Sequence, residues 1–157
     1  MLTEGGPKVI EYNARFGDPE AQAILPLLKS DLLEIMLACE EGRLNADDVV
    51  FSEGYSAGVV LASGGYPGDC EKGFPMEGLE RAAGMRNTLL FHMGTRQGEN
   101  GRVLTDGGRV LTVTGLGKTP GEALGNAYAG VGEIRFNGMN YRKDIGKTTF
   151  RQEISQN

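Results

Sequence analysis

The chain opens with a segment in which polar and apolar residues alternate. Residues 8–15, KVIEYNAR, follow the two-residue period of a β-strand, so Glu11, Asn13 and Arg15 are expected on one face and apolar side chains on the other. The apolar face predicts packing against the protein interior. The polar face is expected to contact either solvent or a ligand.

Two helices are predicted after this strand. Asp18 suits the N-cap position, where a carboxylate accepts backbone N–H bonds, and Pro19 suits the first helical position because its φ angle is already helical. The first helix then continues through EAQAILPLL. Ser30 is expected to cap a second helix with an apolar stripe, and Gly42 is placed to end it.

Near residue 50 the pattern changes to short β-branched runs separated by glycine, which is typical of a small antiparallel β unit. Strands are predicted at 55–63, 88–94, 102–105 and 109–115, the last two joined by the turn DGG. One helix follows: Thr119 and Glu122 form a capping box, and apolar residues recur at helical spacing to residue 134.

These elements indicate an α+β chain in two parts. Residues 1–52 hold one strand and helices, and residues 53–150 form a small β-rich domain with one main helix. The polar tail at 151–157 is expected to be frayed. A length of 157 residues suits one ordinary domain or two very small ones.

Charge and hydropathy exclude two classes of partner. The net charge is -5 and the 16 basic residues are scattered, whereas binding to nucleic acid requires a clustered basic surface. No apolar run approaches the roughly 18 residues of a transmembrane helix. The first residues also lack the pattern of a secretory leader, so a cytoplasmic location is expected, with neither nucleic acid nor membrane as a partner.

The small number of histidine and cysteine residues limits the kinds of catalytic and metal sites that the chain can form. His92 is the single histidine, which excludes a histidine-based zinc site and a Ser-His or Cys-His catalytic pair. Cys39 and Cys70 lack CxxC spacing and are interpreted as reduced thiols. Any catalysis must therefore use carboxylates, amides, lysine or arginine, and His92 is interpreted as a core or edge histidine and not as a ligand.

Glu11 and Asn13 are the first candidate site. Carboxylate and amide oxygens two residues apart on a strand can both reach one Mg²⁺, but a solvated strand face explains the same pattern. Arg15 and Asp18 are the second candidate site. They suit either a local ion pair that fixes the turn or a guanidinium that binds an anionic substrate near a helix N-terminus. Spacing alone leaves both questions open.

A glycine-rich stretch at 63–73, SGGYPGDCEKG, raises the question of a phosphate-binding loop. It matches neither GxGxxG nor GxxxxGK[ST]. A cluster of β-turns with Tyr66 packed inward is expected instead.

The hexapeptide RFGDPE at 15–20, preceded by VIEYN and followed by Gln22, resembles the signature of the glycinamide ribonucleotide synthetase family, also called phosphoribosylamine-glycine ligases. The resemblance continues in order through LPLLKSDLLEIM, GYPGD, FHMGT, TDGGRVL and YRKDIG, to about residue 146. Three residues differ from the family pattern, and none of them is a polar candidate residue: Ala23, Cys70 and Met93.

This resemblance implies an ATP-grasp ligase of purine biosynthesis that joins glycine to 5-phosphoribosylamine through glycyl phosphate. It implies Mg²⁺ or Mn²⁺ bound by Glu11 and Asn13, with Arg15 and Asp18 in the active site. Arg142 and Lys143 in YRKDIG become candidate phosphate contacts, although a surface turn with a local Arg-Asp pair remains an equal alternative.

The resemblance also implies that residues 1–52 form the end of an ATP-grasp domain whose nucleotide-binding portion lies upstream in the family. The chain is therefore expected to be a fragment that is inactive alone, with the N-terminal portion of the enzyme as its partner and ATP, glycine and 5-phosphoribosylamine as ligands. Residues that bind the nucleotide are not identified. The alternatives are a non-catalytic binding or structural module, or a different ATP-grasp carboxylate-amine ligase.

Overall fold

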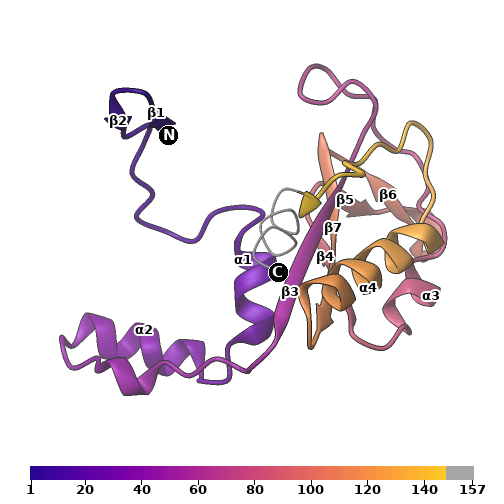
Figure 1. Ribbon diagram of the computed structural model, residues 1–157. Coiled ribbons are helices and arrows are strands. Elements are labelled where there is room, and N and C mark those ends of the chain that lie inside the picture. Colours follow the sequence, from indigo (N-terminus) through magenta and orange to yellow (C-terminus); the bar gives the residue numbers. More distant parts are fainter. Residues whose placement is uncertain (148–157) are drawn as a thin grey trace.

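The computed structural model describes residues 1–147, so the frayed tail predicted at 151–157 lies outside the described residues. Its centre is a three-stranded antiparallel sheet in the order β3–β7–β4, built from Tyr55–Ala62, Arg109–Gly117 and Thr88–His92. A second antiparallel pair, β5 (Thr95–Gln97) and β6 (Val103–Thr105), lies beside it (Figure 1). The expected β-rich unit after residue 53 is therefore present.

One predicted strand pairing is wrong. β6 and β7 do not form a hairpin, because β6 pairs with β5 whereas β7 pairs with β3 and β4. The DGG segment instead crosses between the sheets: Asp106 N–H donates to Gly94 O at 2.7 Å, and Gly94 N–H donates to Arg109 O at 2.8 Å. Glycine is required at this crossing, since a Cβ on Gly94 would lie 2.7 Å from the Cα of Gly107.

Helix α4 (Pro120–Glu133) covers one face of the sheet, as the pattern predicts (Figure 1). Thr119 Oγ1 accepts from Glu122 N–H at 3.1 Å, while the Glu122 carboxylate accepts from Lys118 N–H at 2.7 Å, one residue earlier than a standard capping box. The helix lies very close to β7, because a Cβ on Gly115 would be 2.2 Å from the carbonyl oxygen of Ala123.

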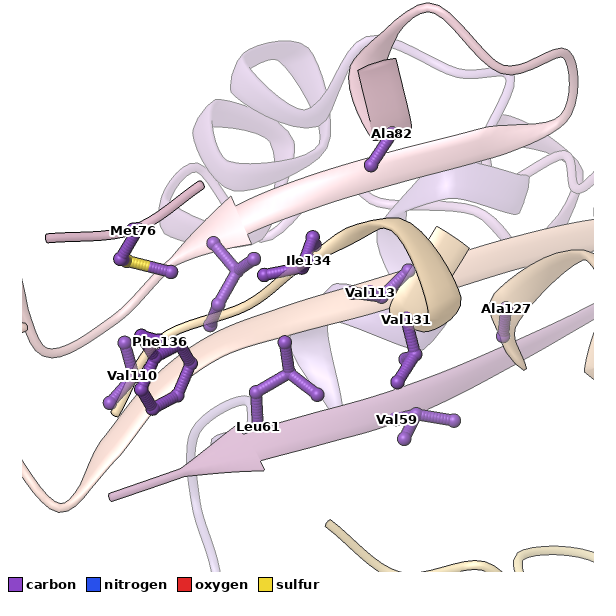
Figure 2. Close-up of a cluster of buried hydrophobic side chains, with 11 residues drawn as sticks. Val59, Leu61, Met76, Ala82, Val110, Val113, Ala127, Val131, Ile134 and Phe136 are labelled. Atoms are coloured by element: carbon purple, nitrogen blue, oxygen red, sulfur yellow. The ribbon is translucent and has the colours of Figure 1, made fainter. Parts of the chain in front are cut away.

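Aliphatic side chains from the sheet and helix α4 fill the space between them (Figure 2). Short helix α3 (Leu79–Ala83) closes the edge with Ala82. Burying each large aliphatic side chain contributes roughly 1.5–3 kcal/mol, so this layer supplies most of the stability of the unit. Its fully buried members include Val59, Leu61, Leu111, Val113 and Ile134.

The N-terminal part is less regular than expected. Residues 8–15 form no strand, because within the described chain their only backbone partner is at Met1, whose carbonyl accepts from Lys8 N–H at 2.8 Å. A β-strand requires a ladder of backbone hydrogen bonds to a neighbouring strand, and an alternating sequence pattern does not supply that neighbour. The bounds of the short elements that flank this segment are β1 (Leu2–Thr3), β2 (Gly6–Pro7), α1 (Ala21–Ile24) and the 3₁₀ turn Leu25–Leu27.

The second predicted helix is confirmed as α2 (Leu32–Glu40), which lies apart from the sheet in Figure 1. Its cap is Asp31, whose Oδ1 accepts from Leu33 N–H at 2.8 Å, and not Ser30, whose hydroxyl accepts from Val50 N–H at 2.8 Å. Gly42 ends the helix with a φ of 67°, as predicted. A 3₁₀ turn at Ala46–Asp48 leads into β3.

The division of the chain at residues 52 and 53 stays a prediction. No helix within residues 1–147 is both long and apolar enough to cross a lipid bilayer.

Candidate functional site

A cavity of about 440 Å³ opens where β4 ends and β7 begins. Four segments that are distant in sequence supply its walls, with side chains that are mostly polar or aromatic. They are Asp18, Gln22, Tyr66, His92, Met93, Gly94, Gly108 and Arg109.

A β-bulge places Arg109 at this cavity. Along β3, Leu61 pairs with Leu111 but the next residue, Ala62, pairs with Arg109, so Val110 is an extra residue in β7. Val110 and Leu111 are both fully buried, and the side chain of Arg109, just before the bulge, contacts the turn at Asp18 instead of the core. Bulges re-aim side chains in this way and are frequent beside functional sites.

Arg109 fixes the turn at Asp18 across 91 residues of sequence. Its Nη1 donates to the carbonyl oxygen of Asp18, and its Nη2 lies 3.3 Å from the Asp18 carboxylate. The same strand holds α1 further along, where the buried Thr114 hydroxyl donates to Gln22 O at 3.0 Å. The turn and the helix are thus attached to β7 at two points.

The prediction that Asp18 caps a helix is wrong. Helix α1 begins at Ala21, Glu20 occupies the cap position without a side-chain bond, and Pro19 precedes the helix. The Asp18 carboxylate is taken by other donors: Gln22 Nε2 at 2.9 Å and the guanidinium of Arg109. A cation is a stronger partner for a carboxylate than a neutral backbone N–H, which explains the difference.

The local ion pair considered for Arg15 and Asp18 is also absent from the described residues. Arg15 Nη1 donates to the carbonyl oxygen of Phe16 at 3.1 Å, and the ionic partner of Asp18 is Arg109.

Glu11 and Asn13 lie on the same side of the chain, as expected for a shared site. Asn13 Nδ2 donates to Glu11 Oε1 at 3.1 Å, and both side chains are exposed. This bond leaves the amide oxygen of Asn13 and a carboxylate oxygen of Glu11 directed away from it, a donor set that suits a hard cation. Among residues 1–147, no three His, Cys, Asp or Glu side chains lie close enough together to hold a metal ion.

Tyr66 is not packed inward, contrary to expectation. Tyr66 is 46% exposed, and its ring lies over Gly108, so that a Cβ on Gly108 would be 2.5 Å from the ring. His92 lies at the end of the edge strand β4 and lines the cavity, so of the two placements expected for it the edge is the one observed. Its Nδ1 is 2.9 Å from Thr95 Oγ1.

Tyr66 and Arg109 also line a second cavity of about 260 Å³, together with Asn140, Tyr141 and Arg142. Arg142 forms a forked pair with Asp144 in which both N–O distances are 3.0 Å, and this hydrogen-bonded pairing lowers the pKa of the Asp144 carboxyl. The structure therefore contains the local Arg-Asp pair that the sequence left open. Lys143, between them, is exposed.

Helix α4 anchors this turn. Tyr128 Oη donates to Arg142 O at 2.9 Å and accepts from Ile145 N–H at 3.2 Å.

Five of the segments that carry the family resemblance meet around these two adjoining cavities. GDPEAQ, GYPGD, FHMGT and TDGGRVL contribute to the first, and YRKDIG to the second. Sequence reasoning assigned Asp18 and Arg142 to a site but missed Gln22, His92 and Arg109. The family motifs could have indicated these residues, because His92 and Arg109 lie inside quoted motifs and Gln22 was named together with RFGDPE.

Comparison with known proteins agrees with this resemblance. Residues 56–148 match the family described as "Phosphoribosylglycinamide synthetase, C domain". The chain is 50% identical over 147 residues to the Schizosaccharomyces pombe "Bifunctional purine biosynthetic protein ADE1", covering 92% of this chain and 18% of that protein. It is 49% identical over 148 residues to the "Phosphoribosylamine--glycine ligase" of Nostoc sp., covering 93% and 35%.

A solved structure gives the same result. The crystal structure of the phosphoribosylamine--glycine ligase from Thermotoga maritima superposes with a TM-score of 0.75 at 35% identity, covering 92% of this chain and 34% of that one. The chain thus spans about a third or less of the length of these three proteins.

Proposed function

Since this chain belongs to the phosphoribosylglycinamide synthetase family, we propose that it forms the C-terminal part of an ATP-dependent ligase that joins glycine to 5-phosphoribosylamine. The observation that carries the proposal is the meeting of the family motifs around the Asp18–Arg109 contact. Identity near 50% over nine-tenths of the chain supports it.

The reaction has two steps. The glycine carboxylate attacks the γ-phosphorus of ATP, which gives glycyl phosphate and ADP; the amine of phosphoribosylamine then attacks the acyl carbon and displaces phosphate to form the amide. Such a reaction depends on positioning and on stabilising the charge of the transferred group. ATP is the co-substrate, and its binding residues belong to the part of the enzyme that this chain does not span.

Glu11 and Asn13 would hold Mg²⁺ or Mn²⁺ together with groups from the rest of the enzyme. Their oxygen donors and their contact at 3.1 Å fit this role. A divalent cation bound there supplies neutralisation of phosphate charge.

The charged side chains that follow the metal-binding pair in the chain, and those of the YRKDIG turn, have orienting roles. Arg15 follows the metal-binding pair in the chain and is assigned to an anionic group of the substrates. Asp18, held by Arg109, fixes the end of the segment that carries these residues. Arg142, which lines the smaller cavity, and the neighbouring Lys143 are assigned to a substrate phosphate.

The N-terminal portion of the same enzyme is the proposed partner. Apolar side chains between residues 9 and 36 are unusually exposed: Ile10 is 73% exposed, Tyr12 89% and Leu33 63%. An apolar surface of this kind is characteristic of a protein interface. In this arrangement residues 8–15 gain the strand partners that they lack here, and the enzyme acts in the cytoplasm.

The proposal is tested by joining this chain to the N-terminal portion of the Nostoc ligase and measuring glycinamide ribonucleotide formation. Turnover by the joined enzyme, with none by the 157-residue chain alone, is expected. A correctly folded joined protein without turnover would instead favour a non-catalytic module.

Calorimetry with Mg-ATP gives a second test on the chain alone. Tight binding is not expected, because the nucleotide pocket lies elsewhere in the enzyme. A dissociation constant in the low micromolar range, roughly -8 kcal/mol, would contradict this assignment.

A further inference from the structure

We propose that the Asn100–Gly101 step, in the loop between β5 and β6, is a site of spontaneous deamidation in the folded protein. Both residues are exposed, and both line a cavity of about 410 Å³ that is separate from the two cavities of the candidate functional site. The proposed ligase reaction does not use this loop, so the inference stands apart from the proposed function.

The modification needs only an asparagine, the backbone nitrogen that follows it and water. The nitrogen of Gly101 attacks the side-chain amide carbon of Asn100, a C–N bond forms, the N–H proton passes to the leaving nitrogen and ammonia departs. Water then opens the resulting five-membered succinimide ring at either carbonyl, which leaves aspartate or isoaspartate at position 100. Asparagine is a thermolabile residue, and a following glycine favours the attack because it has no Cβ and rotates easily.

Three steps in the sequence place glycine after asparagine or aspartate, and aspartate closes the same ring with loss of water. They are Asn100–Gly101, Asp106–Gly107 and Asn137–Gly138. Ring closure requires rotation of the backbone between the two residues, which moves the glycine. The reaction is therefore fastest where the glycine has space and where opening the turn breaks few bonds to the rest of the fold.

Gly101 has this space. A Cβ built on Gly101 meets no heavy atom within 4 Å. Asn100 lies in the left-handed region, with φ 60° and ψ 25°, so ring closure begins with a rotation about ψ. The backbone bond that closes the loop runs from Gly98 N–H to Arg102 O at 2.7 Å, within the β5–β6 connection itself, so opening the loop disturbs only this connection.

The Asp106–Gly107 step is held by the crossing between the two sheets. A Cβ on Gly107 would lie 3.0 Å from the Cα of Gly94, and Ser63 Oγ donates to the Gly107 carbonyl at 2.8 Å. Rotation at this step would therefore separate segments that are distant in the sequence.

The Asn137–Gly138 step is exposed but is also held by a distant segment. A Cβ on Gly138 would lie 3.4 Å from the nitrogen of Gly64. Asn140, two residues later, exchanges two backbone hydrogen bonds with Ala62, at 2.8 and 2.9 Å. The same Asn-Gly chemistry is thus placed in one loop that opens locally and in one turn that is tied to β3.

The cavity beside Asn100 accommodates the negative charge of the product. Arg81 and Arg102 line it together with one carboxylate, Glu80. The guanidinium of Arg81 pairs with Glu133 at 2.9 Å, and Arg102 lies two residues from the new carboxylate along the loop. The modification adds one negative charge to a chain whose net charge is -5, so the product is separable by anion exchange.

The test is incubation of the 157-residue chain in warm, mildly alkaline buffer, folded and in concentrated urea, followed by peptide mapping with mass spectrometry. In the folded chain, position 100 should react at least about tenfold faster than position 137, equivalent to about 1.4 kcal/mol of additional free energy to open the turn at Asn137. In urea the two positions should react at similar rates, because both are Asn-Gly steps without a fold to hold them.

Two substitutions identify the site. Asn100→Gln should remove the acidic species that accumulates in the folded chain, because glutamine closes its larger ring slowly. Asn137→Gln is the matched control, since it changes the other Asn-Gly step in the same way, and it should leave that species unchanged.

Three results would overturn the inference: equal or faster reaction at position 137 in the folded chain, no reaction at position 100 while the chain in urea reacts, or an acidic species that persists in Asn100→Gln. None of these results bears on turnover by the joined enzyme, which tests the proposed function separately.

Discussion

Replacing Arg109 with methionine should release the Asp18 turn while leaving the sheet intact. The substitution keeps an unbranched apolar stem but removes the guanidinium that binds Asp18. The pair is partly exposed, with side chains 36% and 53% accessible, so its ionic contribution falls in the surface range of about 0–1 kcal/mol. Loss of the bond to the Asp18 carbonyl brings the total to about 1–2 kcal/mol.

The effect is local because Thr114 still holds the helix that follows the turn. The hydroxyl of Thr114 donates to Gln22 O, and this bond does not involve Arg109. Hydrogen exchange measures the change directly: the amides of Ala21 and Ile24 bond to Gly17 and Glu20 and should exchange about 5- to 30-fold faster in the variant. Amides in the centre of β7 should exchange at the wild-type rate.

Arg109→Lys provides the conservative comparison, since lysine keeps the charge but not the fork of donors, and it should recover only part of the protection. Equal acceleration of exchange in α1 and in the centre of β7 would refute the reasoning, because it would mean that Arg109 supports the sheet as a whole. Unchanged exchange in α1 would show that the contact does not hold the turn.

Three further predictions concern other parts of the molecule. In the joined enzyme, Glu11→Gln or Asn13→Ala should lower turnover at least about a hundredfold through lost charge stabilisation, and wild-type turnover with unchanged Mg²⁺ dependence would reject the metal assignment. Gly115→Ala should destabilise the fold by about 1–3 kcal/mol or more in urea unfolding because its Cβ collides with helix α4, whereas Gly125→Ala, with open space around it, should be neutral or stabilising. Because pairing with Arg142 lowers the pKa of Asp144, the pair stabilises the fold above the unfolded carboxyl pKa of about 3.9, and this stabilisation is lost as pH falls through the folded value. Replacing Arg142 with glutamine should therefore raise the Asp144 pKa in a ¹³C NMR titration.

Local patterns predicted the elements whose stabilising contacts are local. Helix α4 combines a cap at Thr119 with apolar residues at helical spacing, and strands β3 and β7 combine β-branched residues with glycine boundaries. The patterns failed where a distant residue decides the outcome. Asp18 has the local features of a helix cap, but its carboxylate pairs with Arg109, which lies 91 residues away in the sequence.

The orientation of Arg109 could not be predicted for a related reason. Strict alternation along RVLTVT would place Arg109 on the same face as Leu111 and Val113, which belong to the core. The bulge at Val110 reverses that expectation, and a bulge is set by pairing with β3, not by the residues of β7 alone. Similarly, residues 8–15 alternate correctly but lack a neighbouring strand in the described chain.

The extra residue in β7 also divides the strand into two segments that can change separately. Beyond Val110, the helix-facing side of the strand is constrained by the close approach of helix α4, where even a methyl group on Gly115 has no space. Before Val110, the phase of the alternation is shifted, so substitutions at Gly108 or Arg109 alter the cavity without altering the helix-facing side of the sheet. A single inserted residue thereby lets one strand meet two independent structural demands, packing against the helix and lining the cavity, and deleting it would merge them by turning Arg109 toward the core.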